Sequence, residues 1–385
     1  MPVMERGTEP ASDMRRTHGS QRGSRLAWIL ALAYTLLIVY ASLQPFRDWR
    51  FPPAEILRFL SAPWPRYITL EDVLINLAAY LPLGFLFALA LRGRFAAPAA
   101  VLLAAILAVL LSLLMESAQM FLPARIASNV DLLTNGAGGL FGAMAAPLLS
   151  PSGFPGRRLA AWRQRRFAPG TVTDTGLVIV CLWLFTQLHP TAQLFGTGNL
   201  RGIFDLPIYF THTPQLLFAA EAAIVFLNLL GLGLLITVLT RDADRPFSII
   251  AAVVAAGLLV KTIAAVTLFE SPGPLVWLTP GVALGLVLGM SLLYPLARMP
   301  RIPGLITALL CLGAAVAVIN LAPDNPYQTL PPKLIPGSTT HLLRFSSIVR
   351  ALAELWPFLT VGYLIAAAGS GAQARSLSDL GRTNS

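Results

Sequence analysis

The 385-residue sequence is 56% hydrophobic and only 12% charged, whereas an average soluble domain has about 25% charged residues. This composition excludes a water-soluble globular fold and indicates a polytopic membrane protein. The net charge of +10 is not gathered into a basic stripe with interleaved aromatic residues. Membrane topology and contact with anionic lipid headgroups therefore explain it better than nucleic-acid binding does.

Stretches of about 20 mostly uncharged residues follow one another along the chain, each long enough to cross the hydrocarbon layer as a helix. They are roughly residues 25–43, 72–91, 97–121, 129–149, 174–188, 216–239, 246–269, 274–297, 302–321 and 348–368. The fold class that they predict is all-α, a polytopic bundle of about ten transmembrane helices.

Basic residues set the expected orientation, because positively charged loops stay on the cytoplasmic side. With the N-terminus inside, the cytoplasmic segments hold about twice as many arginines and lysines as the outer segments. An even number of spans returns the chain to its starting side. We therefore expect a multi-pass protein of the cytoplasmic membrane with both termini inside.

The expected spans and the polar segments between them suggest a division of the chain. Residues 1–24 are polar and arginine-rich, which is typical of a disordered cytoplasmic tail. The remaining parts are a four-helix membrane domain (25–150), a basic cytoplasmic linker (151–173), a second four-helix block (174–297), two C-terminal spans with an outer loop (298–368) and a cytoplasmic tail (369–385).

Polar residues gather in the first four-helix domain, at the expected outer ends of its second, third and fourth spans. They are Asp72, Asn76, Glu116, Gln119, Arg125, Asp131 and Asn135. Spacings of three or four residues place the members of a pair on one helix face, and the direction of each span brings the three faces to one level. The sequence therefore predicts an outward-facing polar pocket near the headgroup boundary. The long outer connections 44–71, 189–215 and 322–347 carry prolines and aromatic residues, which suggests interfacial segments that roof this pocket; aromatic belts alone are the alternative, because they would give the same composition.

A purely structural interpretation competes with this pocket. Asp72 and Asp131 would then complement helix dipoles from first turns, with Asn129 as an N-cap. Glu116 stands at the negative end of its helix, so it needs a cation or hydrogen-bond donors when buried. Arg125 in the short connection is the nearest candidate, and an ion pair between Glu116 and Arg125 is the structural alternative.

Three stretches of this domain carry a family resemblance. They are YASLQPF, DVLINLAAYLPLGFLFALAL and ESAQMFLPARIASNVDLLTNGAGGLFG, within roughly residues 26–150. Together they resemble the VanZ-like family, named after the teicoplanin-resistance accessory protein of glycopeptide-resistant bacteria. The most specific part is the E-x-x-Q, Arg and D-x-x-x-N-x-x-G pattern. The resemblance implies a cell-envelope role without a particular mechanism, and it favours the pocket.

Glycines give the fourth span a face of small residues. Gly138 and Gly142 are four residues apart, so they lie on one helix face and allow another helix to approach closely. We expect them to serve packing.

The second block is similar to the first in several places. A gapless alignment of residues 221–241 on residues 72–92 pairs Glu221 with Asp72, and LTPGVALGLVLG is similar to LTNGAGGLFG. Four crossings restore the starting side, so a degenerate second copy of the four-helix unit would have the same orientation. Chance similarity between leucine- and glycine-rich helices is the alternative.

Lys261 lies within an expected span, which makes it a candidate functional residue. Glu221, at a similar depth, is its expected partner, and the two form a secondary intramembrane pair whose alternative is a structural ion pair. Asn228 is expected to bond between helices, and Arg350 is expected to pair locally with Glu354 at i,i+4.

No metal or cofactor is expected. His189, His212 and His341 fall in outer loops and lack an H-x-x-x-H or H-E-x-x-H signature. Cys181 and Cys311 fall inside spans, where packing is their expected role. The chain also has no P-loop or G-x-G-x-x-G pattern, which disfavours nucleotide-dependent work.

Two classes of function fit these observations. In the first, the pocket binds or acts on a lipid-linked glycan or a phospholipid headgroup, with Arg125 on phosphate and Glu116 or Asp131 as candidate catalytic acids or bases. Such a protein would also affect susceptibility to glycopeptide antibiotics. In the second, the chain is a non-enzymatic transporter subunit or assembly partner for envelope polysaccharide export, and the pocket only fixes helix packing. Membrane lipids are the expected partners in both, with a cell-wall precursor as a further partner in the first.

Overall fold

The computed structural model is α-helical. It describes residues 11–44, 46–52, 55–64, 68, 70–149, 154–188, 194–196, 198–201, 213–241, 246–267, 273–322 and 349–369. Within these residues every regular element is an α-helix or a short 3-10 turn, apart from one isolated β-bridge between Phe167 and Thr240. The chain divides into two compact units, Met1–Trp162 and Arg163–Ser385, which are described separately.

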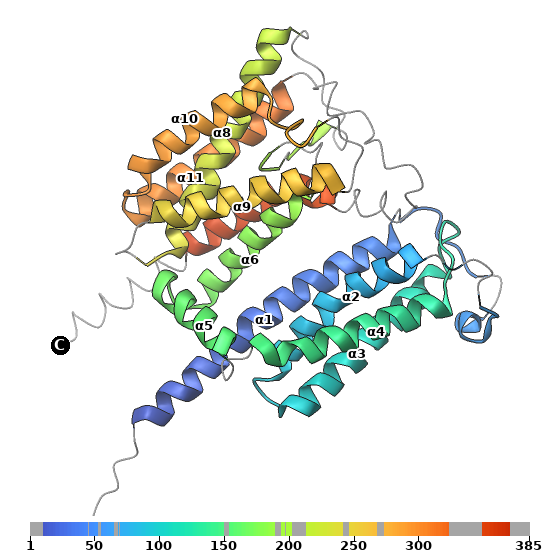
Figure 1. Cartoon of the computed structure of the whole chain (residues 1–385). Helices are drawn as coiled ribbons and strands as arrows, with labels where there is room; N and C mark the ends of the chain where they lie inside the picture. The colour runs from blue at the N-terminus through green and yellow to red at the C-terminus, as the bar shows by residue number, and fades with distance from the viewer. Residues whose placement is uncertain are drawn as a thin grey trace, which may run out of the picture. The chain divides into compact units, whose positions relative to one another are not determined.

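Unit 1 is built from long helices that lie side by side (Figure 1). Its elements are α1 (Ala11–Leu43), the 3-10 turn η1 (Arg58–Ser61), α2 (Leu70–Leu91), α3 (Ala97–Gln119), α4 (Asn129–Ala145) and the 3-10 turn η2 (Ala146–Leu149). The backbone of α1 is helical from Ala11, where composition predicts a disordered tail, and residues 1–10 lie outside the described residues. We call the end at which α1 and α3 finish and α2 and α4 start the polar end of unit 1.

Unit 2 is organised around one central helix. Its helices are α6 (Thr171–Thr186), α8 (Pro214–Leu239), α9 (Pro246–Thr267), α10 (Pro280–Leu296), α11 (Arg301–Leu321) and a last helix, Val349–Gly369. α8 is largely buried and contacts α6, α9, α10 and α11 (Figure 1). The basic linker forms α5 (Phe154–Arg166), and the division between the units falls within it.

Seven helices within the described residues are long and apolar enough to cross a membrane. They are Arg25–Leu43, Asp72–Leu91, Ala97–Gln119, Pro214–Leu239, Pro246–Val266, Arg301–Leu321 and Val349–Gly369. α6 and α10 are apolar but shorter, and α4 reaches the length expected of its span only together with η2. The helical membrane bundle is confirmed, while the number of ten spans and the N-in, C-in orientation stay predictions.

Glycines bring α2 and α4 into direct backbone contact. A Cβ atom added to Gly142 would lie 1.8 Å from the carbonyl oxygen of Leu81, and one added to Gly138 would lie 2.3 Å from the carbonyl oxygen of Leu77. Helices can approach this closely only where no side chain separates their backbones. The packing role predicted for Gly138 and Gly142 is confirmed.

The helices α8 and α10 of unit 2 pack in a related way. A Cβ atom on Gly285 would lie 2.6 Å from the carbonyl oxygen of Ala222, and one on Gly281 would lie 3.0 Å from that of Phe218. The likeness to unit 1 is partial, because α3 packs along α4 whereas α9 shares no comparable contact with α10. The degenerate repeat stays a prediction.

Candidate functional site

The polar end of unit 1 holds the last carbonyl groups of α1, which have no partners within their own helix. Arg125 donates from Nε to the Gln44 carbonyl (3.0 Å) and from Nη2 to the Ala41 carbonyl (2.5 Å). Gln119 donates from Nε2 to the Ser42 carbonyl (3.1 Å). The positive guanidinium also complements the negative end of the α1 dipole. These two motif residues therefore fasten the end of α1 to α3 and to the connection that follows it.

Glu116 is buried, with 3% of its surface exposed, and its Oε2 accepts a hydrogen bond of 2.8 Å from the backbone N–H of Ser128. Ser128 directly precedes the first turn of α4, so the positive end of the α4 dipole lies beside the carboxylate. Arg125 and Asp131 lie close enough to act on its charge. The sequence showed that Glu116 needs a donor, and the structure supplies a backbone N–H in addition to the nearby Arg125.

The N-cap of α4 is Ser128, and the assignment of Asn129 to this position was wrong. The Ser128 Oγ accepts a hydrogen bond from the Asp131 N–H (3.3 Å), which satisfies one free donor of the first turn. Asn129 is the first helical residue, and its Nδ2 donates instead to the carbonyl of Ala62 (2.8 Å). Asn129 thereby ties the segment around η1 to the start of α4.

A second polar layer lies deeper in unit 1, between α2, α3 and α4. Asn135 donates from Nδ2 to the Ser112 Oγ over 3.0 Å, and both residues are buried. The Asn135 Oδ1 and the Asn76 Nδ2 have no hydrogen-bond partner within the described residues, and the hydroxyl of buried Tyr80 lies near Ser112. Sequence reasoning missed Ser112 and Tyr80, although each stands four residues from a predicted site residue, Glu116 or Asn76, on the same helix face.

The remaining predicted pocket residue, Asp72, lies in the first turn of α2 and is partly exposed. It is therefore at the polar end, as expected. Of the predicted set, Glu116, Gln119 and Arg125 bond to helix ends, and Asn135 belongs to the deeper polar layer. An open pocket lies beside the residues that bond to helix ends.

That pocket is a cavity of about 370 Å³, next to Arg125. Its lining residues are Arg50, Phe51, Arg58, Phe59, Ala62, Met120, Leu122, Pro123, Arg125, Ile126 and Ala127. Arg125 is the member of the predicted pocket set among them. The cavity is therefore formed by the connection between α1 and α2 together with the connection between α3 and α4, and we call it the arginine cavity.

Two hydrogen bonds hold one wall of the arginine cavity in place. The backbone N–H of Arg50 donates to the Phe121 carbonyl (3.0 Å), and Asn129 binds Ala62 as described above. The rings of Phe51 and Phe121 also meet edge to face, with centroids 6.3 Å apart. Arg50 and Ala62 are thus tied to the α3–α4 side, while the roofing role expected of the long outer connections stays a prediction.

In unit 2, Glu221 and Lys261 are both buried, Lys261 with only 1% of its surface exposed. The Glu221 Oε2 accepts a hydrogen bond of 2.5 Å from the Thr279 hydroxyl, and Thr279 is the N-cap of α10. The pairing of Glu221 with Lys261 stays a prediction. The expectation for Asn228 was wrong, because its Nδ2 donates to the Ile224 carbonyl (3.0 Å) of its own helix.

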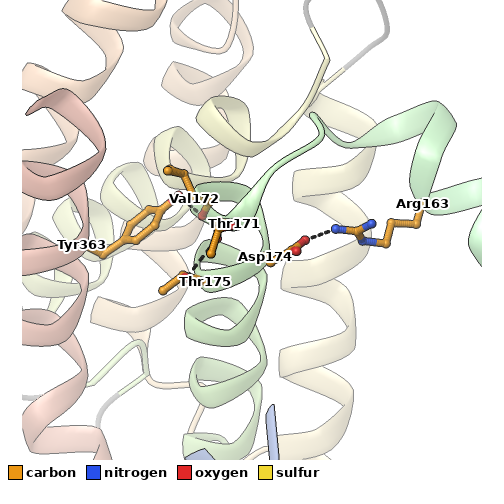
Figure 2. A network of polar contacts seen from close by, with 6 residues as sticks. All are labelled: Arg163, Thr171, Val172, Asp174, Thr175 and Tyr363. Carbon is orange, nitrogen blue, oxygen red and sulfur yellow. Dashed lines mark hydrogen bonds and ion pairs between the residues drawn. The ribbon is translucent and has the colours of Figure 1, made fainter. Parts of the chain in front are cut away.

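Another polar network lies where α5 leads into α6 (Figure 2). Arg163 forms an ion pair with Asp174, which is buried in the first turn of α6. On the other side of this turn the Tyr363 hydroxyl donates to the Val172 carbonyl (2.9 Å), and its ring points toward α6 in Figure 2. This network connects α5, α6 and the last helix, and the sequence pattern of the basic linker did not reveal it.

The local pair of Arg350 and Glu354 is confirmed, with an Nε to Oε1 distance of 3.3 Å. The described residues contain no group of three or more histidine, cysteine, aspartate or glutamate side chains that could hold a metal ion. His189, His212 and His341 lie outside the described residues.

Comparison with known proteins identifies one family. The family model described as VanZ/LLP1 matches residues 17–150, which include α2, α3, α4 and the network at the polar end of unit 1. No curated protein and no solved structure matches the chain. Residues 17–150 therefore form a VanZ-like domain of a multi-helix membrane protein.

Proposed function

We propose that the VanZ-like domain binds a lipid component of the cell envelope at the arginine cavity, in the outer half of the cytoplasmic membrane, without covalent chemistry. The observation that carries this proposal is the cavity itself. It combines arginine side chains with aromatic and aliphatic ones, as a site for a charged headgroup and the start of an apolar chain requires.

The rim of the cavity favours a ligand that comes from the membrane. Phe51 and Ile126 line the cavity and are 90% and 89% exposed. Trp49 and Trp64 in the same connection are also exposed. Tryptophan is typical of the membrane interface, so the cavity would open where lipid headgroups and upper chain segments lie.

The hydrogen bonds of the motif residues favour binding over catalysis. Gln119 and Arg125 donate to α1 carbonyl groups, Glu116 accepts from the Ser128 N–H, and Asn135 donates to Ser112. Each contact connects two segments of the domain. The role of these residues in this proposal is to hold the walls of the arginine cavity. The same role fits a protein that acts alone and one that is a transporter subunit or assembly partner for polysaccharide export.

Filling the cavity tests the proposal. Ala62→Trp places a large ring on an exposed lining residue, and Ala99→Trp places the same ring on an exposed residue near the start of α3. After purification in mild detergent, native mass spectrometry would count the lipids retained by each variant. We expect Ala62→Trp to lose a bound lipid that the wild type and Ala99→Trp retain. Equal retention by both variants would refute lipid binding at this cavity.

A cellular measurement connects the site to the envelope. In a host where the wild type changes susceptibility to a lipoglycopeptide antibiotic, Ala62→Trp should lose that effect at normal membrane abundance, and Ala99→Trp should keep it. Full protection by Ala62→Trp would show that the arginine cavity does not mediate the effect on the antibiotic.

A further inference from the structure

We infer that the arginine cavity selects the phosphate group of an amphiphile whose headgroup carries no compensating positive charge. This assignment of ligand class rests on the lipid-binding function proposed above. Such an amphiphile is an anionic phospholipid or a lipid-linked phosphate, as opposed to a zwitterionic lipid or a neutral glycolipid.

The charges of the lining residues are all of one sign. Among the residues that the structure describes, Arg50, Arg58 and Arg125 line the cavity and no acidic residue does. Asp48 and Glu55 belong to the same connection but do not line the cavity. A headgroup with its own ammonium group would bring that cation towards several guanidinium groups, which is unfavourable. A headgroup with net negative charge meets only guanidinium groups among the charged residues that are described as lining the cavity.

Arginine is suited to this ligand because its planar guanidinium offers several N–H groups that match the oxygens of a phosphate. The positions of these arginines are set by the fold. Arg125 is oriented by its bonds to the α1 carbonyls of Ala41 and Gln44. The backbone of Arg50 is bound to Phe121, and Arg58 is the first residue of η1. Less side-chain freedom is therefore lost at Arg125 when an anion binds, while Arg50 and Arg58 are fixed at the backbone.

The apolar lining residues explain why the ligand would be an amphiphile. Phe59 and Leu122 are buried in the wall of the cavity, and Phe51, Met120 and Ile126 complete its apolar part. Inorganic phosphate would leave this surface without a partner, whereas the first carbons of an acyl or prenyl chain would cover it.

The volume limits the size of the bound group. A cavity of about 370 Å³ is near the lower end of the roughly 300–1,000 Å³ that small-molecule sites span. It accommodates a phosphate headgroup with the first part of one chain. An extended glycan would have to project beyond it.

The test measures lipid selectivity with the full-length protein in nanodiscs or in mild detergent. Phosphatidylglycerol, phosphatidylcholine and inorganic phosphate serve as probes. The test variant is Arg50→Gln/Arg58→Gln, and the matched control is Arg47→Gln, which removes an exposed arginine of the same connection that does not line the cavity. Arg125 is left intact because it also holds α1.

We expect the wild type and Arg47→Gln to bind phosphatidylglycerol at least about tenfold more tightly than phosphatidylcholine, and this difference to shrink at high salt. Arg50→Gln/Arg58→Gln should bind phosphatidylglycerol about tenfold more weakly or worse, with unchanged binding of phosphatidylcholine. Inorganic phosphate at millimolar concentration should not displace the lipid.

The outcomes separate this inference from the proposed function. If Ala62→Trp abolishes lipid binding but the double arginine variant binds both lipids as the wild type does, the phosphate selectivity is wrong and lipid binding stands. If Ala62→Trp binds lipid normally, the proposed function fails and the inference fails with it. If inorganic phosphate displaces phosphatidylglycerol fully, the ligand is a free phosphate and the assignment to an amphiphile is overturned.

Discussion

The substitution Glu116→Gln tests whether the carboxylate of Glu116 has a structural or a catalytic role. The Oε2 of Glu116 accepts the Ser128 N–H over 2.8 Å, and glutamine has nearly the same shape and keeps an oxygen that accepts the same bond. Losing the negative charge turns a charge-assisted hydrogen bond into an ordinary one, which costs about 1 kcal/mol. Glu116→Leu removes the acceptor altogether and strands the N–H at the start of α4, which costs about 1–3 kcal/mol.

The assay combines abundance in the membrane, thermal unfolding in detergent and retained lipid. With about 2–4 °C per kcal/mol for a domain of roughly this size, Glu116→Gln should unfold within a few degrees of the wild type and retain lipid normally. Glu116→Leu should unfold several degrees lower and reach lower abundance. The contrary result is a Glu116→Gln protein that has normal abundance and unfolds normally but no longer retains lipid or no longer changes antibiotic susceptibility. This result would refute the structural role and point to chemistry at the carboxylate.

Further variants test the packing and the networks by unfolding temperature in detergent. Gly142→Ala should lower stability by about 1–3 kcal/mol because its Cβ would lie 1.8 Å from an α2 carbonyl oxygen. The Cβ of Gly136→Ala would meet only one methyl group of Val109, at 3.1 Å, and this variant should be tolerated better. Equal effects of the two substitutions would contradict the close approach of α2 and α4. Asp174→Asn removes the charge that pairs with half-buried Arg163 and should lower the free energy of unfolding by about 2 kcal/mol. An unchanged unfolding temperature would show that this ion pair is not needed for stability. Arg125→Met loses the hydrogen bonds to the end of α1 and should increase protease cleavage in the connection after α1. A wild-type cleavage pattern would contradict the role of Arg125 in holding the end of α1.

Helix positions and the polar end of unit 1 could be predicted from the sequence because both depend on periodic patterns. Long uncharged stretches mark α2, α3 and α8. The i,i+3 and i,i+4 spacings of acids and amides place them on common helix faces, and the direction of each span brings those faces to one level. The glycine spacing in α4 likewise predicts a close helix contact.

The individual contacts could not be predicted, and the reasons are physical. The acceptors for Gln119 and Arg125 are backbone carbonyls of α1, which have no signature in the sequence. Ser128 and Asn129 are adjacent and both are good N-cap residues, so the sequence does not distinguish them. The arginine cavity depends on how a long connection folds back, and neither Arg50 nor Arg58 belongs to a periodic pattern.

The central claim is that the arginine cavity holds the headgroup of an anionic lipid. The most direct measurement is an electron cryomicroscopy structure of the full-length protein in nanodiscs that contain phosphatidylglycerol. The account predicts density for a phosphate within hydrogen-bond distance of Arg50 and Arg58, with a chain that continues along Phe51 and Ile126. A well-resolved cavity that contains only water, or that is closed by the connection between α1 and α2, would contradict it.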